Sequence, residues 1–285
     1  MLDYQNDQFK SLEELKEIAP SIFTKTGSDK TSSKYTHIPT DRVIKDLELL
    51  GWGVVDAKEV NARQDKGYQK HLVVFRNPDV SINKKSTNVD GEVFEDIVFP
   101  QILVTNSHDG KNSFKFQAGL FRMICENGLV VADESFEDYS IRHMGYDFEA
   151  LQSLITEMVS NLDLTVESMN KMKQIELDEE QQLELAKKLL DIRLEGTGNA
   201  YDDYQPKYIN YSQRKEDDGI DLWSVFNRQQ ENIIEGNFKY FNGEKYAKYE
   251  NVNMEFIGRQ ARPIKNFKQD MDVNKKMFAA ALELV

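Results

Sequence analysis

The side chains best suited to chemistry are four histidines, all of which lie before residue 147. Metal sites place histidines at close spacing to one another, to cysteines or to carboxylates, as in HxH, HExxH and CxxC motifs. His37, His71, His108 and His143 follow none of these patterns. The best local pair is His108-Asp109, and its aspartate is better explained by a turn. We therefore predict no metal site and no bound cofactor, and expect hydrogen-bonded or surface histidines.

The single cysteine, Cys125, is the other side chain that offers nucleophilic chemistry. A thiol nucleophile needs a nearby histidine and a lowered pKa, and the residues next to Cys125 indicate only a small buried thiol. Gly110 and Gly128 lie in turns that match neither GxxxxGK[ST] nor GxGxxG phosphate loops. The serines lack the GxSxG context of a hydrolase. We predict no catalytic residue and favour a non-enzymatic protein.

Basic and aromatic residues alternate along the predicted strands. Lys115, for example, lies between Phe114 and Phe116. Single-stranded nucleic acid is commonly held by such surfaces, with phosphates on Lys or Arg and bases stacked on aromatic rings. The predicted nucleic-acid-binding residues are Lys70, Arg76, Lys111, Lys115, Arg122, Arg142 and His143. The alternative is an ordinary amphipathic sheet, with phenylalanines in the core and lysines in water, which produces the same alternation.

Residues 1–146 predict a mainly antiparallel sheet packed with two helices. Ser11-Leu-Glu-Glu14 is a capping box before the first helix, and Thr40 is expected to cap the second, which Gly51 ends. Between them, Thr24–Thr36 is a Ser/Thr-rich loop, of the kind that connects elements or closes on a ligand. Hydrophobic residues then recur with period two. Strands are predicted at residues 52–60, 68–76, 92–105, from 114, at 129–132 and at 139–144.

Several segments of this part leave the local structure open. Asn77–Asp90 is polar and is predicted to be a loop, whereas Asp109-Gly110 predicts a tight hairpin turn. Pro100 lies inside the strand predicted at 92–105, which indicates an edge strand, a bulge or two strands. Residues 119–126 fit a short helix or a buried strand, because so short an apolar run has no decisive period.

From residue 147 the hydrophobic period changes to that of a helix. Apolar residues three and four apart predict one amphipathic helix of roughly 25 residues from Phe148 to Met172. Further helices are expected after the cap residues Asp178 and Asp221 and from about Asp270 to Leu284, with tyrosine-rich loops at 195–220 and 237–250. The predicted fold class is α+β, with a mainly antiparallel N-terminal sheet packed with helices and a C-terminal helical region. The predicted division is 1–146 and 147–285, with one shared core.

Composition restricts the class of protein further. The chain of 285 residues is 40% hydrophobic and carries a net charge of −13, which argues against a general nucleic-acid-coating surface because phosphate contact is largely electrostatic. No apolar run approaches the roughly 20 residues of a membrane span, and the first residues lack the pattern of a signal peptide. A single cysteine agrees with a reducing compartment. We therefore expect a cytoplasmic protein without a membrane partner.

Residues 107–131 resemble a phage- and plasmid-encoded family known as domain of unknown function 932. Its members tend to carry an Asp-Gly turn and a later R-x-x-C-x-N-G-L segment, and the matching core-motif residues here are Asp109, Gly110, Arg122, Cys125, Asn127 and Gly128. The resemblance covers about residues 20–285, with further motifs at Tyr35–Thr40, Lys70–Arg76, Arg142-His143 and Leu222–Asn227. It implies an origin in a mobile element more firmly than it implies a chemistry.

Two functions from different classes follow. The first is a phage or plasmid protein of the host cytoplasm that associates with nucleic acid, such as a factor that binds or anneals single-stranded DNA. The second is an interaction protein that binds and inhibits a host protein, such as a defence component, through its acidic surface and its methionine-rich long helix. Homo-oligomers are compatible with either function.

Overall fold

The computed structural model describes residues 9–33, 35–62, 66–80, 82–87, 90–122, 127–129, 139–141, 147–242 and 258–285. Tertiary contacts group the chain into two compact units. Unit 1 is Met1–Ile82, Val98–Phe121 and Asp133–Leu162, and unit 2 is Asn83–Ile97, Arg122–Ala132 and Asp163–Val285. Two long elements, β4 (Val93–Asn106) and α3 (Phe148–Met172), contribute residues to both units. The division predicted at residue 146 stays a prediction.

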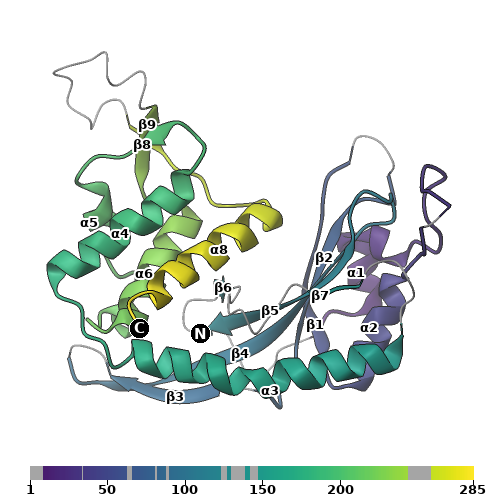
Figure 1. Cartoon of the computed structure of the whole chain (residues 1–285), viewed down its shortest axis with the longest axis horizontal. Helices are drawn as coiled ribbons and strands as arrows, with labels where there is room; N and C mark the ends of the chain where they lie inside the picture. Colours follow the sequence, from purple (N-terminus) through teal and green to yellow (C-terminus); the bar gives the residue numbers. More distant parts are fainter. Residues whose placement is uncertain are drawn as a thin grey trace. The chain divides into compact units, whose positions relative to one another are not determined.

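A seven-stranded sheet has the strand order β1-β2-β4-β5-β6, with β3 also paired to β4 and β7 to β5 (Figure 1). The pairs β1–β2, β2–β4 and β5–β7 are antiparallel. The remaining strands are β1 (Gly53–Glu59), β2 (His71–Arg76), β3 (Ile82–Thr87), β5 (Phe114–Arg122), β6 (Asn127–Leu129) and β7 (Tyr139–Ile141). Together with the helices described below, this sheet confirms the predicted α+β class.

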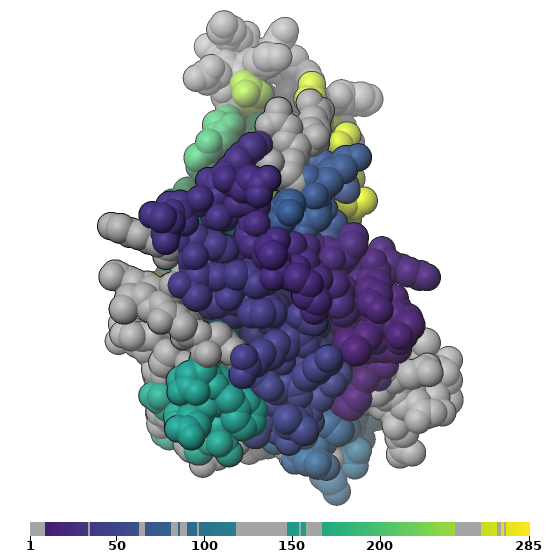
Figure 2. All heavy atoms as spheres, turned by 90° about the vertical axis from the view of Figure 1, so that its right-hand side faces the viewer, coloured from purple at the N-terminus to yellow at the C-terminus, as the bar shows by residue number. Residues whose placement is uncertain are grey.

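Three short helical segments cover one face of the unit 1 sheet: α1 (Leu12–Ile18), the 3-10 helix η1 (Pro20–Phe23) and α2 (Thr40–Leu49). Side chains alternate across a strand, so Val73 and Phe75 share the face of His71, whose ring contacts both η1 and α2. Val73 and Phe75 are fully buried, as are Val104 and Ile102 of β4. This face and the apolar side of α2 form the core of unit 1, and Figure 2 shows the N-terminal helices from outside.

One strand prediction requires correction, and one of the alternatives left open at Pro100 is excluded. Residues 77–90 were expected to form a loop, but β3 occupies Ile82–Thr87 and pairs with β4. Polar strands of this kind lack the alternating pattern, so pairing with β4 overrides local propensity. Pro100 does not end or split β4, which runs through it for 14 residues. The β2–β4 pairs end where Arg76 lies opposite Gln101. Pro100 is the β4 residue just beyond this last pair, so it costs no hydrogen bond in the β2–β4 ladder.

The hairpin at Asp109-Gly110 is confirmed. β4 ends at Asn106, β5 begins at Phe114, and Gly110 has a left-handed φ of +75°. On β5, Phe114 and Phe116 are buried as expected for one face of a strand. The strand continues to Arg122, which confirms the strand alternative up to that residue, while residues 123–126 lie outside the described part of the chain.

Unit 2 is arranged around α6 (Leu222–Glu235), in which every residue from Leu222 to Ile234 is buried. Helices α4, α5 and α8 all pack on α6. The other elements of this unit are α4 (Glu179–Leu194), β8 (Asn199–Ala200), α5 (Gln205–Ile209), η2 (Lys215–Asp217), β9 (Lys239–Asn242), β10 (Arg259–Gln260) and α8 (Phe267–Leu282). The tyrosine-rich segments predicted as loops thus contain short elements, including the small sheet β10-β9-β8.

A run of six polar residues lies inside α6, and several of them hydrogen-bond to neighbouring segments. The guanidinium of Arg228 donates from Nη1 to the carbonyl oxygen of Asp217 at 2.9 Å and from Nη2 to Oε1 of Gln182 at 2.9 Å. Asn232 donates to the carbonyl oxygens of Ile209 and Tyr211. Buried polar groups are tolerated when they are bonded. This network therefore fixes the 205–219 segment onto α6.

The predicted helix starts are largely confirmed. Ser11 and Asp178 each form a capping box, and Asp221 caps α6 through the backbone N–H of Ser224. Thr40, however, does not cap α2. Pro39 occupies the N-cap position without a side-chain cap. The Thr40 hydroxyl instead bonds to His71 and Asn106, because a tertiary partner competes for it.

Gly236 closes α6 and provides a test of the packing in unit 2. It has φ +76°, and a Cβ built there would lie 2.8 Å from backbone carbons of Ala261 and Arg262. We expect Gly236→Ala to lower the free energy of unfolding by roughly 3 kcal/mol, since backbone strain and a clash add together.

The matched control is Gly196→Ala. Gly196 has a similar φ of +70°, but its Cβ would meet no described atom within 4 Å. The Gly196→Ala substitution should lower the free energy of unfolding by only about 1 kcal/mol, because only the backbone conformation is strained. Urea unfolding followed by circular dichroism measures both values, and equal losses would show that the chain at Ala261 does not pack against Gly236.

Candidate functional site: a histidine cluster beneath a basic loop end

Three histidines from separate parts of the chain meet inside unit 1. The ring centroids of His37 and His108 are 4.5 Å apart, and those of His71 and His108 are 5.4 Å apart. His71 and His108 are fully buried. His37 precedes α2, His71 begins β2, and His108 follows β4. The cluster thus lies where these three elements converge.

His71 is held on both ring nitrogens. Its Nδ1 lies 2.9 Å from the hydroxyl of Ser21, and its Nε2 lies 2.9 Å from the hydroxyl of Thr40. Nδ1 is also 3.3 Å from the carbonyl oxygen of Gln69, which can only accept a hydrogen bond. We assign the proton to Nδ1 on that ground. Nε2 then accepts from Thr40, whose oxygen accepts in turn from Asn106 at 2.9 Å.

Burial controls the protonation of this ring. Removal from water lowers the pKa of His71 to about 4, and the hydrogen bond to the Gln69 carbonyl opposes that shift only in part. The ring is therefore neutral at pH 7. Ser21 is also fully buried, so the Ser21–His71 pair serves to connect η1 to β2 and does not face solvent as a nucleophile and base.

The Ser/Thr-rich loop after η1 is attached to the β4–β5 hairpin. The backbone N–H of Ser28 donates to the carbonyl oxygen of His108 at 2.8 Å, and the hydroxyl of Tyr35 donates to that of Ser107 at 3.3 Å. A Cβ at Gly110 would lie 3.1 Å from the methyl of Thr31. The loop is therefore packed in place over the histidine cluster.

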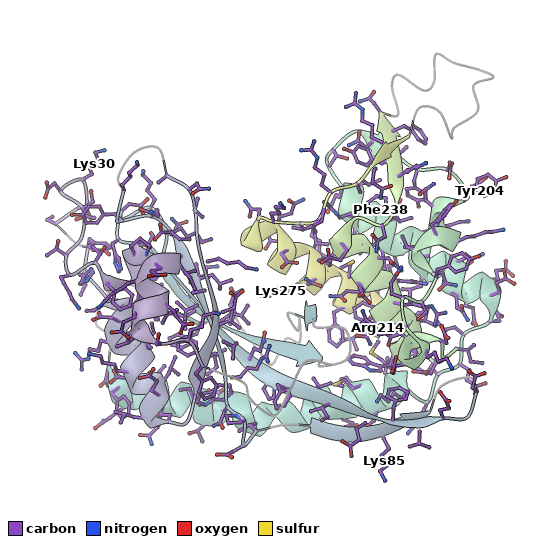
Figure 3. The ribbon with its side chains drawn as sticks, turned by 180° about the vertical axis from the view of Figure 1, so that it is seen from behind. Lys30, Lys85, Tyr204, Arg214, Phe238 and Lys275 are labelled. Atoms are coloured by element: carbon purple, nitrogen blue, oxygen red, sulfur yellow. The ribbon has the colours of Figure 1, made fainter. Side chains whose placement is uncertain are left out.

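The turn between β1 and β2 joins the same assembly. The backbone N–H of His108 donates to the carbonyl oxygen of Tyr68 at 2.9 Å, and the Thr24 hydroxyl donates to that of Gly67. We call the surface formed by residues 24–33, 66–70 and 107–111 the loop end. These three loops form one surface because each is bonded to another, and Figure 3 shows Lys30 projecting from it.

The loop end is locally basic in an acidic chain. It carries five lysines, Lys25, Lys30, Lys66, Lys70 and Lys111, against Asp29 and Asp109 within it and Asp41 and Glu59 beside it. Five positive and four negative charges give +1, whereas the whole chain carries −13. Such a local reversal of charge favours anionic ligands over a short range.

Lys111 and Lys25 have acidic neighbours but remain accessible. Lys111 lies 3.7 Å from Asp109 with 67% of its side chain exposed, and Lys25 pairs with Asp41 with 69% exposed. Their carboxylate partners are largely buried, at 13% exposed for Asp109 and 12% for Asp41, so each lysine presents its exposed part to solvent beside a held carboxylate. Asp109 is mainly occupied by the turn, since its Oδ1 accepts from the Ser107 hydroxyl at 2.8 Å and from the Lys111 N–H at 3.0 Å.

The structure separates the residues that the sequence grouped as a nucleic-acid face. Lys70 and Lys111 lie together at the loop end. Arg76 lies at the other end of β2, about 17 Å along the strand from His71 at the usual rise per residue. There it faces Gln101, whose oxygen, with the amide turned toward Arg76, accepts from Nε at 3.0 Å. Lys115 is half-buried on β5 opposite Ser140 of β7.

The remaining predicted residues are only partly covered. Arg122 ends β5 and Asn127 and Gly128 lie in β6, where only the backbone is described. Cys125, Arg142 and His143 lie outside the described residues. Asp109 and Gly110 of the core motif form the hairpin turn beside the histidine cluster.

Sequence reasoning missed the cluster itself, although a signal was present. Each of its histidines lies in or beside a short motif, at Tyr35–Thr40, Lys70–Arg76 and Ser107–Gly110. None of the histidines has the local spacing of metal ligands, and that spacing gives no sign that three of them meet in the fold. Within the described part of the chain, no group of three or more His, Cys, Asp or Glu side chains is arranged to hold a metal ion.

Comparison with known proteins identifies the family of this chain. The chain matches the family model "Domain of unknown function (DUF932)" over residues 29–278. The chain belongs to this family. It is 30% identical over 237 residues to UPF0380 protein YafZ of Escherichia coli (strain K12), covering 81% of this chain and 80% of that protein. UPF0380 protein YfjQ of the same organism is 29% identical with the same coverage. No solved structure matches.

Among the helices in the described ranges, none is long and apolar enough to cross a membrane.

The depressed pKa of His71 predicts a pH-dependent stability. Because the folded pKa of about 4 lies below the unfolded value near 6.5, the unfolded state binds more protons between these values. Stability is therefore lost as pH falls from about 6.5 toward 4. We expect a loss of about 2–3 kcal/mol from this ring between pH 7 and pH 4.5.

The control is His71→Gln, which cannot titrate. Urea unfolding of both proteins at the two pH values isolates the histidine, because the carboxylates contribute equally to each. The stability difference between wild type and variant should shrink by about 2–3 kcal/mol on acidification. A difference that does not change with pH would contradict a neutral, buried His71.

Proposed function

We propose that this protein binds single-stranded nucleic acid through phosphate contacts at the loop end of unit 1. The observation that carries the proposal is the set of five lysines on three loops that are hydrogen-bonded to one another. Lysine side chains bind phosphate as mobile point charges, so loops of fixed backbone with long cationic side chains suit a repeating anionic ligand. The proposal requires binding only and no chemical step.

The net charge of −13 affects the expected affinity for nucleic acid and its dependence on salt. At about 0.1 M salt the loop end attracts a polyanion only within the Debye length of about 10 Å, and at lower salt the repulsion from the acidic remainder of the surface reaches further. Binding should therefore be moderate in affinity and limited to a few phosphates. Its salt dependence should be correspondingly modest, with a slope of about 0.7 per phosphate contact for a single strand.

The origin of the protein and the compartment in which it acts are proposed from the family resemblance. We propose that the protein derives from a phage or plasmid and acts in the host cytoplasm, with single-stranded DNA as its partner. Assembly of several copies along a strand is compatible with the proposal and would raise affinity by multivalency.

Inhibition of a host protein stays the second candidate. One observation behind it weakens: Met169 and Met172 of α3 are buried in the core of unit 2, so these two methionines do not offer an adaptable binding surface. The acidic surface remains as its support. Recovery of a stoichiometric host protein from a lysate, together with no affinity for nucleic acid, would favour this function.

The proposal is tested by reversing charge at the loop end. We expect Lys70→Glu combined with Lys111→Glu to weaken binding of a fluorescent single-stranded oligonucleotide by about tenfold or more, and to reduce the salt slope, because two phosphate contacts become repulsive. Fluorescence anisotropy across a series of salt concentrations measures both quantities.

Two controls locate the effect. Lys45→Glu makes the same change of −2 as each single loop-end substitution, on the exposed face of α2 and outside the loop end, and should leave affinity within about twofold of wild type. Arg76→Glu and Lys115→Glu test the strand surface instead. If those variants lose binding while the loop-end pair does not, the phosphate site lies on the strands and this proposal is wrong.

A further inference from the structure

We infer that unit 2 has a separate binding site for a nucleobase with its phosphate, in the pocket between α5 and the small sheet. The pocket has a volume of about 690 Å³, within the range of sites that hold small ligands. Six of the residues that line it carry the inference: Tyr204, Gln205, Tyr208, Phe238, Lys239 and Gln260. The inference does not rest on the proposed function, since it concerns different residues and a different contact.

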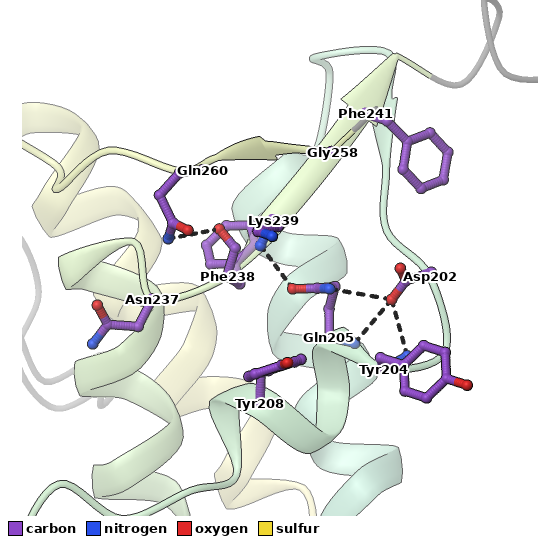
Figure 4. Close-up of a pocket in the computed structure, with 10 residues that line it drawn as sticks. All are labelled: Asp202, Tyr204, Gln205, Tyr208, Asn237, Phe238, Lys239, Phe241, Gly258 and Gln260. Carbon is purple, nitrogen blue, oxygen red and sulfur yellow. Dashed lines mark hydrogen bonds between the residues drawn. The ribbon is translucent and has the colours of Figure 1, made fainter. Parts of the chain in front are cut away.

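Two exposed aromatic rings supply the stacking surfaces. Tyr204 is 69% exposed and Tyr208 is 59% exposed, and both line the pocket. Figure 4 shows Tyr208 below Phe238, and Tyr204 on the other side of Gln205, below Asp202. Phe238 is buried and closes the base of the site. Flat, wet aromatic faces of this kind bind bases by stacking, which is worth about 1–3 kcal/mol per base.

The polar walls are positioned by the backbone. Gln205 accepts from the N–H of Lys239 at 2.7 Å and donates to Oδ1 of Asp202 at 3.2 Å. Gln260 donates to the carbonyl oxygen of Phe238 at 3.1 Å. These bonds connect α5 to β9, and β10 to the segment before β9, so the pocket keeps its shape without a ligand. A preformed site loses less entropy on binding.

The charges around the pocket indicate the class of ligand. Lys239 lines it, and the exposed residues Lys207 of α5 and Arg259 of β10 lie on the elements that form it. Two acidic residues lie nearby: Asp203 is exposed, and Asp202 is engaged by the N–H groups of Tyr204 and Gln205 at 3.0 and 3.2 Å. Aromatic rings alone would equally suit a proline-rich peptide. Rings combined with Lys239 in the lining and two further cations on the same elements favour an aromatic base carrying a phosphate.

The test uses 2-aminopurine, whose fluorescence falls when the base stacks. It is presented in one arm as the free nucleoside monophosphate and in the other within a short single strand. We expect quenching on binding, and Tyr208→Ala should weaken it about five- to hundredfold while Tyr208→Phe keeps it. Binding of the monophosphate would identify a nucleotide site, and binding of the strand alone would identify a base of a polymer; either outcome supports the site.

The matched control is Tyr211→Ala. Tyr211 is as exposed as Tyr204, at 69%, but it does not line the pocket, so its loss should leave quenching unchanged. The Lys70→Glu, Lys111→Glu variant should also keep quenching of the monophosphate, which separates this site from the loop end. The inference is overturned if neither probe is quenched, if Tyr211→Ala weakens binding as much as Tyr208→Ala, or if a proline-rich peptide binds there and the nucleotide does not.

Discussion

One imidazole ring connects the parts of unit 1. His71 bonds to η1 through Ser21 and to α2 through Thr40, and its strand pairs with both β1 and β4. The constraint is physical: burial keeps the His71 ring neutral, and each hydrogen bond lost from its nitrogens would cost about 1–3 kcal/mol. The hydroxyls of Ser21 and Thr40 are therefore required at these positions, and they fix where the two helical segments lie on the sheet.

The surface above the cluster depends on this arrangement. His108 bonds through its backbone both to the loop after η1 and to the β1–β2 turn, so the buried histidines and the basic loops form one structure. Unit 2 uses the same device, because Arg228 and Asn232 within α6 hold the segment that carries α5. In each unit a buried polar network supports an exposed surface that presents cations, at Lys70 and Lys111 in the first and at Lys239 in the second. The two surfaces differ in that only the second adds exposed aromatic rings.

Much of the fold follows from local sequence patterns. The period of the apolar residues predicted α3 to its ends, and Asp178, Asp221 and Gly236 predicted the limits of their helices. These signals are local because a cap or a turn involves residues a few positions apart. The Asp109-Gly110 turn was predictable for the same reason. β3 was not, because its residues are polar and only pairing with β4 makes them a strand.

Local sequence patterns could not predict the candidate sites. By itself the sequence determined the fold class, the long helices and the acidic charge, since these depend on composition and on short-range periodicity. The tertiary structure alone decided that Thr40 bonds to a histidine instead of capping a helix, that Lys70 and Arg76 face different surroundings, and that three histidines meet. The reason is that each of these outcomes depends on strand register and on loop packing, which bring together residues that are distant in the chain.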